Sequence, residues 1–176
     1  MQGTLRHCVL IFALAVAGLL GLPPASAQLA EVSSGNVEVS VMIGSRVWIT
    51  RLNDIDLGNY SGNGSLSGTA RMCVYRNDSG IYNITATSSN ASNGTFRAAA
   101  GGQFVPYEVA FRDRVGNTFE EIVSGQRLTG LQGLNFAVLC LFLDNAALDV
   151  TFREADLQAA TPGSYQDVIT LLVEPG

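Results

Sequence analysis

Three pairs of acidic residues have the types and spacing that could do chemistry. Two carboxylates in a cleft can hydrolyse a glycoside, and carboxylates with loop carbonyl groups can bind calcium. Spacing along the chain defines no cleft, and acids in such positions are typical of strand ends and turns. We therefore predict no catalytic residue, no metal site and no cofactor, so the chain is not expected to be an enzyme. The pairs are Asp54 and Asp56, Glu120 and Glu121, and Glu154 and Asp156.

The N-terminus has the three-part layout of a secretory signal peptide. Arg6 and His7 form a basic end, an apolar run covers residues 8–22, and Ala25, Ser26 and Ala27 offer a small-x-small cleavage site. The apolar run is too short to span a bilayer comfortably. We expect residues 1–27 to be removed, with Gln28 as the first residue of the mature protein. A retained membrane anchor is the alternative.

This cleavage would limit histidine and cysteine chemistry. His7 is the only histidine, and its loss would exclude a Ser-His-Asp relay and a histidine-containing zinc site. Cys8 would also be lost, which leaves Cys73 and Cys140. An even pair in an exported protein predicts one disulfide, with two buried free thiols as the alternative. Both cysteines lie in strand-like apolar stretches, TARMCVY and FAVLCLF, so the bond is expected to join two core strands.

Size and charge restrict the partners. Removing 27 of 176 residues would leave 149, which is the size of one domain. The chain would lose one of its ten basic residues and keep all fifteen acids, so its formal net charge would fall from -5 to -6. Nucleic-acid binding needs a basic face that neutralises phosphates. We therefore predict no nucleic-acid partner, and contact with a membrane only during export.

Six Asn-x-Ser/Thr triplets could accept glycans in a eukaryotic secretory protein. A bacterial chain would leave them unmodified, and their density is also explained by turns built from Asn, Gly and Ser. The triplets begin at Asn59, Asn63, Asn77, Asn83, Asn90 and Asn93.

Short alternating apolar segments separated by Gly-rich loops predict an all-β protein, an antiparallel β-sandwich without a division into further domains. Residues 76–80 and 114–117 are expected to form hairpin turns, and residues 61–68 and 89–95 to form loops. Pro106 indicates that its strand lies at an edge or carries a bulge. The expected strands are VWITRL (47–52), TARMCVY (69–75), IYNITATS (81–88), QFVPYEVAFRD (103–113), FEEIV (119–123), FAVLCLFL (136–143) as a buried strand, and YQDVITLLVEPG (165–176).

Residues 144–160 fit two structures. A helix could begin at Asp144, but Leu148, Val150 and Phe152 alternate with polar residues, which favours a strand. In the closing segment, Ile169, Leu171 and Val173 share one face, and the opposite face is also mostly apolar. That last strand is therefore expected to be central and covered on both sides.

The segment GNVEVSVMIG, residues 35–44, has the alternation of a strand near the start of the mature chain. Val37, Val39, Val41 and Ile43 lie on one side of an extended chain, and Glu38, Ser40 and Met42 lie on the other. Such a strand can pair with its own sheet or with that of a neighbour.

Several stretches resemble, in the same order, the spore-coat-U-like pilins of chaperone-usher pathways. PGSYQDVITLLV (162–173) is similar to their final strand, and IDLGNY (55–60) to the stretch after their first strand. ARMCVYRNDSGIYNITA (70–86) resembles their cysteine-bearing strand with its hairpin partner. GNVEVSVMIG occupies the place of their N-terminal donor segment. The family's usual first-strand cysteine would fall near Val47 or Trp48, and neither is a cysteine.

The resemblance implies an immunoglobulin-like sandwich that lacks one strand. Residues 28–44 would be the donor extension and residues 45–176 the domain. A periplasmic chaperone would first cover the open groove beside the C-terminal strand, and a neighbouring subunit's donor strand would replace it at the outer-membrane usher. Val37, Val39, Val41 and Ile43 would fill that groove, which Ile169, Leu171 and Val173 would line.

The sequence thus leaves three hypotheses. The preferred one is a structural subunit of a secreted pilus or surface fibre on a Gram-negative cell, joined by donor-strand exchange. The second is a minor or tip subunit, or a free-standing secreted β-sandwich that binds glycan or protein through its loops. The third is a secreted hydrolase that uses a pair of acids.

Overall fold

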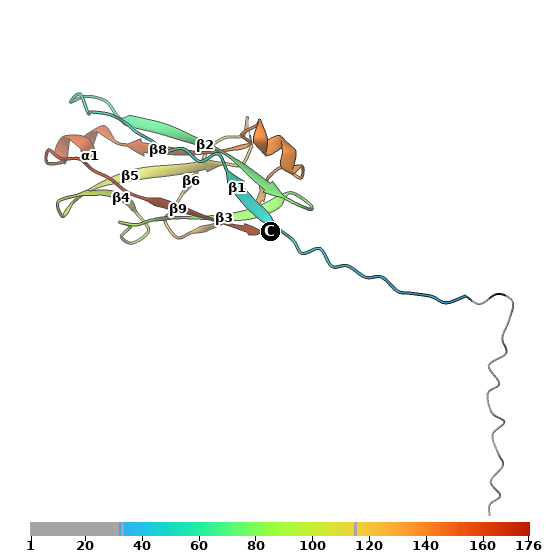
Figure 1. Ribbon diagram of the computed structural model, residues 1–176. Helices are drawn as coiled ribbons and strands as arrows, with labels where there is room; N and C mark the ends of the chain where they lie inside the picture. The colour runs from blue at the N-terminus through green and yellow to red at the C-terminus, as the bar shows by residue number, and fades with distance from the viewer. Residues whose placement is uncertain (1–31, 33, 115) are drawn as a thin grey trace, which may run out of the picture. The chain divides into compact units, whose positions relative to one another are not determined.

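The computed structural model describes residue 32 and residues 34–114 and 116–176 (Figure 1). The predicted signal peptide, residues 1–27 with cleavage before Gln28, lies outside the described residues. The chain forms two units, Met1–Val41 and Met42–Gly176. No helix in the described part of the chain is long and apolar enough to cross a membrane.

The second unit is built from two antiparallel sheets, as the sequence predicts, and has short helical turns (Figure 1). Every strand pair within the two sheets is antiparallel. The first sheet has the order β1(Val47–Thr50), β2(Leu66–Arg76), β8(Ala146–Phe152), β5(Gln103–Arg112), β4(Phe96–Ala100), with β6(Glu120–Ile122) also on β5. The second has the order β7(Arg127–Gln132), β3(Ile81–Ser88), β9(Ile169–Pro175), and the helical turns are η1(Ala137–Leu141) and α1(Glu154–Ala159).

The core lies between the two sheets and follows the two-residue period of the strands. Met72 and Val74 of β2 are fully buried, and Ile84 of β3 and Phe111 of β5 are buried with them. Burial of each such side chain contributes about 1.5–3 kcal/mol. The segment IDLGNY forms no strand, but its Ile55 packs against the core. A Cβ at Gly68 would lie 2.6 Å from the Ile55 side chain, so glycine is needed where this segment crosses β2.

The predicted hairpin around residues 76–80 is wrong. β2 pairs with β1 and β8, whereas β3 pairs with β7 and β9, so the turn crosses from one sheet to the other. The local turn signal does not distinguish these outcomes, because the partners of each strand come from distant parts of the chain. β2 also begins at Leu66, inside the segment predicted to be a loop.

The hairpin of β5 and β6 is confirmed. Pro106 was expected to mark an edge strand or a bulge, but β5 lies between β8 and β4 in the first sheet. Pro106 pairs with Arg97 of β4 on one side. On its other side β5 begins to pair with β8 only at Glu108. Proline therefore occupies a part of β5 where the strand has a single partner and no ladder bond is lost.

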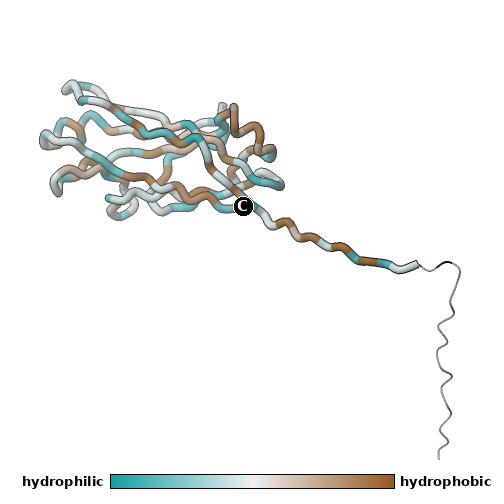
Figure 2. The backbone as a smooth tube through the Cα atoms, in the orientation of Figure 1, coloured by the Kyte–Doolittle hydropathy of each residue, from teal (hydrophilic) through white to brown (hydrophobic). Residues whose placement is uncertain are grey.

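The apolar run 136–143 was predicted to be a buried strand, and this is wrong. It forms η1, in which Cys140 alone is buried while Phe136, Leu141 and Phe142 are exposed. β2 already pairs with β1 and β8, so the cysteine attaches this run to the face of the sheet rather than to its edge. η1 is visible as an apolar stretch in Figure 2.

Residues 146–152 form the predicted strand β8, and the helical alternative holds only for the short α1 that follows it. β9 is not central: it pairs with β3 alone in the part of the chain that the structure describes, and its Leu172 is 56% exposed. The sequence pattern did not predict β4 and β7 as strands. Asn83 is buried within β3, so this Asn-x-Thr triplet is not part of a turn.

Candidate functional site

The candidate site is the side of the sandwich where β1 and β9 lie. Among the described residues β1 pairs only with β2, and β9 pairs only with β3, so each strand is the edge of its sheet. Cα atoms of the two strands approach within 8 Å of one another. Both open edges therefore lie on the same side of the core (Figure 1).

The inward side chains of both edge strands are only partly covered. These side chains pack against the core but remain half-buried, whereas Met72 and Val74 on the adjacent strand β2 are fully buried. In a closed sandwich a flanking strand covers such positions. The core is thus incompletely covered along this side, at Val47 and Ile49 of β1 and at Ile169, Leu171 and Val173 of β9.

The edge of β9 lacks the usual protection against pairing. Natural edge strands are blocked by charges, prolines or bulges. β9 has none of these from Ile169 to Val173, and Arg127 and Glu174 form an ion pair only near its end, at 3.3 Å. An open, regular and apolar edge of this kind is a ready template for another strand.

The connector, residues 35–44, is the other open element. It forms no strand, and its aliphatic side chains are highly exposed, with Val39 at 88% and Val41 at 84%. Figure 2 shows the alternation of apolar and polar residues along it. Because exposed aliphatic surface is unfavourable in water, the connector has the character of a strand without a sheet.

A polar cluster fixes the start of β9. The Asp167 carboxylate accepts hydrogen bonds from the Ser89 hydroxyl at 2.6 Å, the Asn90 amide at 2.9 Å and the Tyr107 hydroxyl at 2.5 Å. Partial burial by itself raises the pKa of Asp167, but these and other hydrogen bonds outweigh it and lower the pKa below its usual value. Burial, with the hydrogen bond to Asp167, raises the pKa of Tyr107.

Because folding lowers the pKa of Asp167, this carboxylate stabilises the domain above its unfolded pKa of about 3.9. That stability is lost as the pH falls through the lower, folded pKa. Asp167→Asn is expected to lower the melting temperature at neutral pH and to make it less dependent on pH in the acid range. The measurement is the melting temperature of the parent and of the variant at several pH values from neutral to acid. Asp54→Asn, at an exposed site, is the control. Equal pH dependence in both variants would contradict it.

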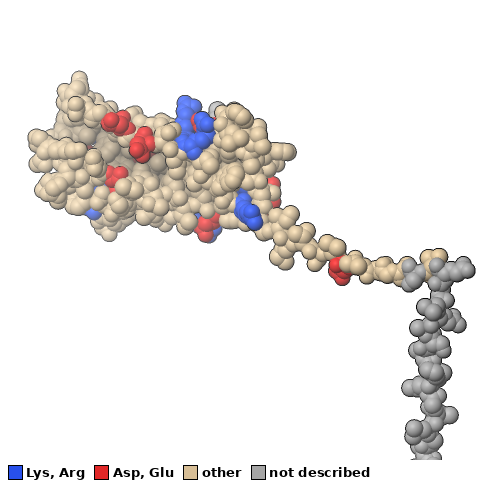
Figure 3. All heavy atoms as spheres, in the orientation of Figure 1, with Lys and Arg blue, Asp and Glu red and all other residues tan. Residues whose placement is uncertain are grey.

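The acids considered as catalytic pairs lie on the surface or in an open hollow. Asp54, Asp56 and Glu120 are exposed. Glu121 and Asp156 do line one hollow of about 380 Å³, together with the ion pair of Glu108 and Arg153. In the described part of the chain, no three potential metal ligands form a group that could hold an ion. On the face shown in Figure 3, acidic side chains are spread singly and basic side chains form small groups.

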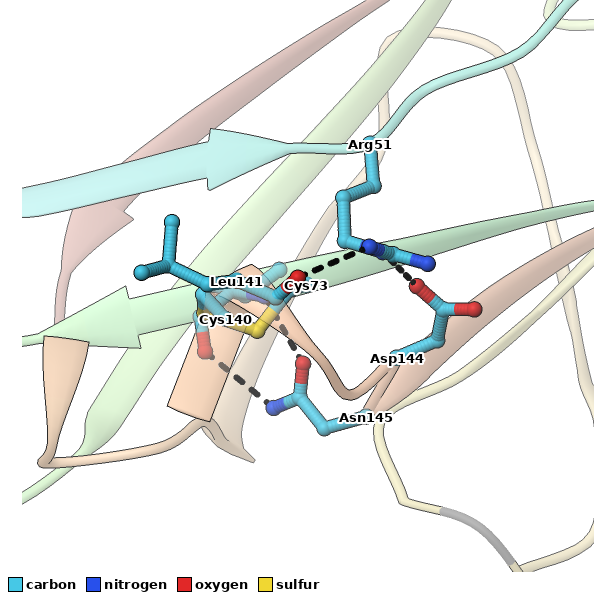
Figure 4. Close-up of a disulfide and its surroundings, with 7 residues drawn as sticks. Arg51, Cys73, Cys140, Leu141, Asp144 and Asn145 are labelled. Carbon is cyan, nitrogen blue, oxygen red and sulfur yellow. Dashed lines mark hydrogen bonds and ion pairs between the residues drawn. A yellow bond between two sulfur atoms is a disulfide. The ribbon is translucent and has the colours of Figure 1, made fainter. Parts of the chain in front are cut away.

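The predicted disulfide between Cys73 and Cys140 is confirmed, with a Cα–Cα distance of 5.4 Å. It joins β2 to η1, however, and not two core strands. The Asn145 amide adds a second attachment, since it accepts from the Val74 N–H at 2.8 Å and donates to the Val74 carbonyl at 3.1 Å. Arg51 adds a third, donating to Asp144 and to the Leu141 carbonyl (Figure 4). η1 is therefore held firmly with its apolar side chains in solvent.

No protein-family model matches the sequence, and no curated protein matches it. The fold is similar to that of a chain in a solved structure described as "Chaperone-tip adhesin complex is vital for synergistic activation of CFA/I fimbriae biogenesis". The TM-score is 0.53 and the sequence identity 19% over 75% of this chain and 42% of the other. This chain thus spans less than half of the solved chain, and the likeness shows an all-β sandwich fold shared with a fimbrial protein complex.

Sequence reasoning missed the contribution of β1 to this side of the sandwich. Val47 and Ile49 alternate with Trp48 and Thr50, and this alternation could have indicated an inward face. The exposed Trp48 instead packs against Tyr75 with its ring tilted by 51°, at 5.2 Å between ring centroids. Sequence reasoning also missed Arg76, which is buried and hydrogen-bonds within the turn after β2. Nothing in the sequence marked it except its place before Asn77 and Asp78.

Proposed function

We propose that this protein is a structural subunit of a secreted pilus or surface fibre, joined by strand addition. The connector of one copy enters the open side between β1 and β9 of the next copy. The observation that carries this proposal is the unprotected edge of β9 beside the open edge of β1, above a partly covered core, in a chain that also contains the exposed apolar connector. The fimbrial complex with a similar fold supports it.

The proposed joint is energetically sufficient. The main chain of the connector would hydrogen-bond to an open edge, and alternate side chains would cover the half-buried positions of β1 and β9. Burial of Val37, Val39, Val41 and Ile43 would contribute about 6–12 kcal/mol before ordering costs. Ten extended residues span about 33 Å, which is enough to follow all of β9. A periplasmic chaperone would have to cover the same edge until assembly at the outer-membrane usher.

The test uses the domain and the connector as separate molecules. Residues 45–176, expressed in a periplasm, are expected to have a low melting temperature that rises when a peptide of residues 35–44 is added. At a peptide concentration 100 times its Kd, the stabilisation is about 2.7 kcal/mol. The control is the same peptide with aspartate at positions 39 and 41. A domain that is fully stable alone and unaffected by the connector peptide would rule the proposal out.

The firmly held η1 favours a second candidate. An apolar surface fixed by a disulfide can bind another protein, as in a minor or tip subunit or a free-standing secreted sandwich. This candidate is distinguished by the same experiment, because a free-standing domain needs no connector peptide for stability.

A further inference from the structure

The junction between the connector and β1 contains a hairpin signal. Gly44 and Ser45 form a Gly-Ser pair between two alternating segments, which is typical of a two-residue hairpin loop. Such a hairpin would pair the connector with the open edge of β1 in the same chain. Self-pairing of this kind would remove both the donor and one edge of the acceptor.

A two-residue loop, 44–45, would turn the polar face of the connector toward the core. It would place Met42 opposite Val47 and Ser40 opposite Ile49. Because opposite residues in an antiparallel pair point to the same side of the sheet, the polar face of the connector would lie over the core. Val39 and Val41 would remain in solvent.

A loop of three residues, 44–46, gives the favourable face. Ile43 would then lie opposite Val47, and Val41 opposite Ile49, with the aliphatic side chains over the core. Three-residue hairpin loops place their last residue in the left-handed region, where glycine is favoured. Here that residue is Arg46, so a side chain makes this loop less favourable.

In the structure the same three residues are held in another conformation. The Asn77 side chain accepts a hydrogen bond from the Arg46 N–H at 2.8 Å and donates to the Gly44 carbonyl at 3.0 Å. The Asn77 N–H donates to the Arg46 carbonyl at 3.2 Å. The Ser45 hydroxyl donates to Asp78 at 3.0 Å and accepts from Arg76 at 3.2 Å. Gly44 does not adopt the positive φ that a Gly-Ser hairpin requires.

Arg76 holds the residues that make these hydrogen bonds in place. Arg76 is only 8% exposed, and its guanidinium also donates to Asp78 and to the carbonyl groups of Ile81 and Gly176, the last at 2.8 Å. The residue therefore connects the start of β1, the turn between the sheets and the end of β9. We call this arrangement, Gly44–Arg46 held by Arg76, Asn77 and Asp78, the junction clamp.

We propose that the junction clamp prevents the connector from pairing with its own β1, so that both remain available to another copy. The inference rests on the proposed function, since it concerns how strand addition is directed between chains. Asn77 is the positioning residue, because its side chain binds Gly44 and Arg46, two of the three residues that would form the self-pairing loop. Arg46 contributes by occupying the position that favours glycine.

The test removes the clamp and makes the loop favourable in the full mature chain. Asn77→Ala combined with Arg46→Gly is expected to give a chain that closes on itself. Capture of a fluorescent peptide of residues 35–44 by the dilute, freshly refolded variant should fall at least tenfold relative to the parent. Exchange of the β1 amides that point away from β2 should slow at least tenfold, and the oligomer fraction in size-exclusion chromatography should fall. Asn117→Ala, in the turn between β5 and β6, is the matched control and should behave like the parent.

Slower exchange separates closure from simple loss of structure, because a purely structural role of Asn77 predicts faster exchange in β1. Peptide capture equal to that of the parent, without slower exchange, would overturn the inference. Protection in the parent monomer of the β1 amides that point away from β2 would also overturn it, since β1 bonds only to β2 in the single chain. If the double variant does not fold, Asn77→Ala alone should show both changes in smaller measure. A parent that captures no peptide, and whose β1 amides on the open side exchange freely, would contradict the proposed function. Slower exchange of those amides in the variant would still support the clamp.

Discussion

Replacing both Val39 and Val41 with aspartate is expected to abolish assembly between copies while leaving the melting temperature of the monomer unchanged. Both side chains are highly exposed in the single chain, so the change removes no contact that stabilises it. In the joint, each lost aliphatic side chain removes about 1.5–3 kcal/mol. Each carboxylate would in addition have to leave water. Affinity should therefore fall by at least about 100-fold.

The measurement is the fraction of oligomer after refolding, by size-exclusion chromatography with light scattering. Ser40→Asp is the matched control, since it adds a charge to the same segment on the opposite side of the extended chain. It should retain assembly. Equal loss of assembly in both variants would show that charge, and not the aliphatic face, is responsible, which contradicts the proposed joint.

Loss of the disulfide is expected to have the largest effect on the stability of the domain. Replacing both Cys73 and Cys140 with alanine removes a cross-link between residues 67 positions apart. In the chain-entropy model, opening a loop of this size lowers the free energy of unfolding by about 4 kcal/mol. Cys73 and Cys140 are both buried, so replacing them with alanine also removes the packing contacts of their sulfur atoms.

Urea denaturation of the double variant and of the parent, with and without a reducing agent, measures this effect. The reduced parent should approach the variant, which acts as its control. Because the disulfide attaches η1 and not β5, amide exchange in the variant should increase more in η1 than in β5. The attachments of η1 through Asn145 and Arg51 remain in the variant. A decrease below about 1 kcal/mol would contradict the prediction, because it would mean that the unfolded chain is hardly restrained by the bond.

The sequence alone determined the features that depend on local alternation and on composition. The two-residue period of Leu148, Val150 and Phe152 predicted β8, and the pair of cysteines in a chain expected to be exported predicted the disulfide. These signals are local, or count residues, so they do not depend on which strands become neighbours.

Only the tertiary structure decided how the elements are partnered. The turn at residues 76–80 was consistent with a hairpin, yet β2 and β3 belong to different sheets because each has better partners elsewhere in the chain. The run at residues 136–143 had the composition of a core strand, but the sheet next to Cys73 has no free position for it. Long-range pairing decides both outcomes, and no local pattern records it.

The last strand combines both kinds of information. Its sequence, apolar on both faces, predicted a strand covered from both sides, whereas in the isolated chain β9 is an edge with Leu172 exposed. Alternation specifies which side chains need cover, because apolar surface is unfavourable in water. Which chain supplies that cover depends on pairing in three dimensions, and here the single chain leaves β1 and β9 open.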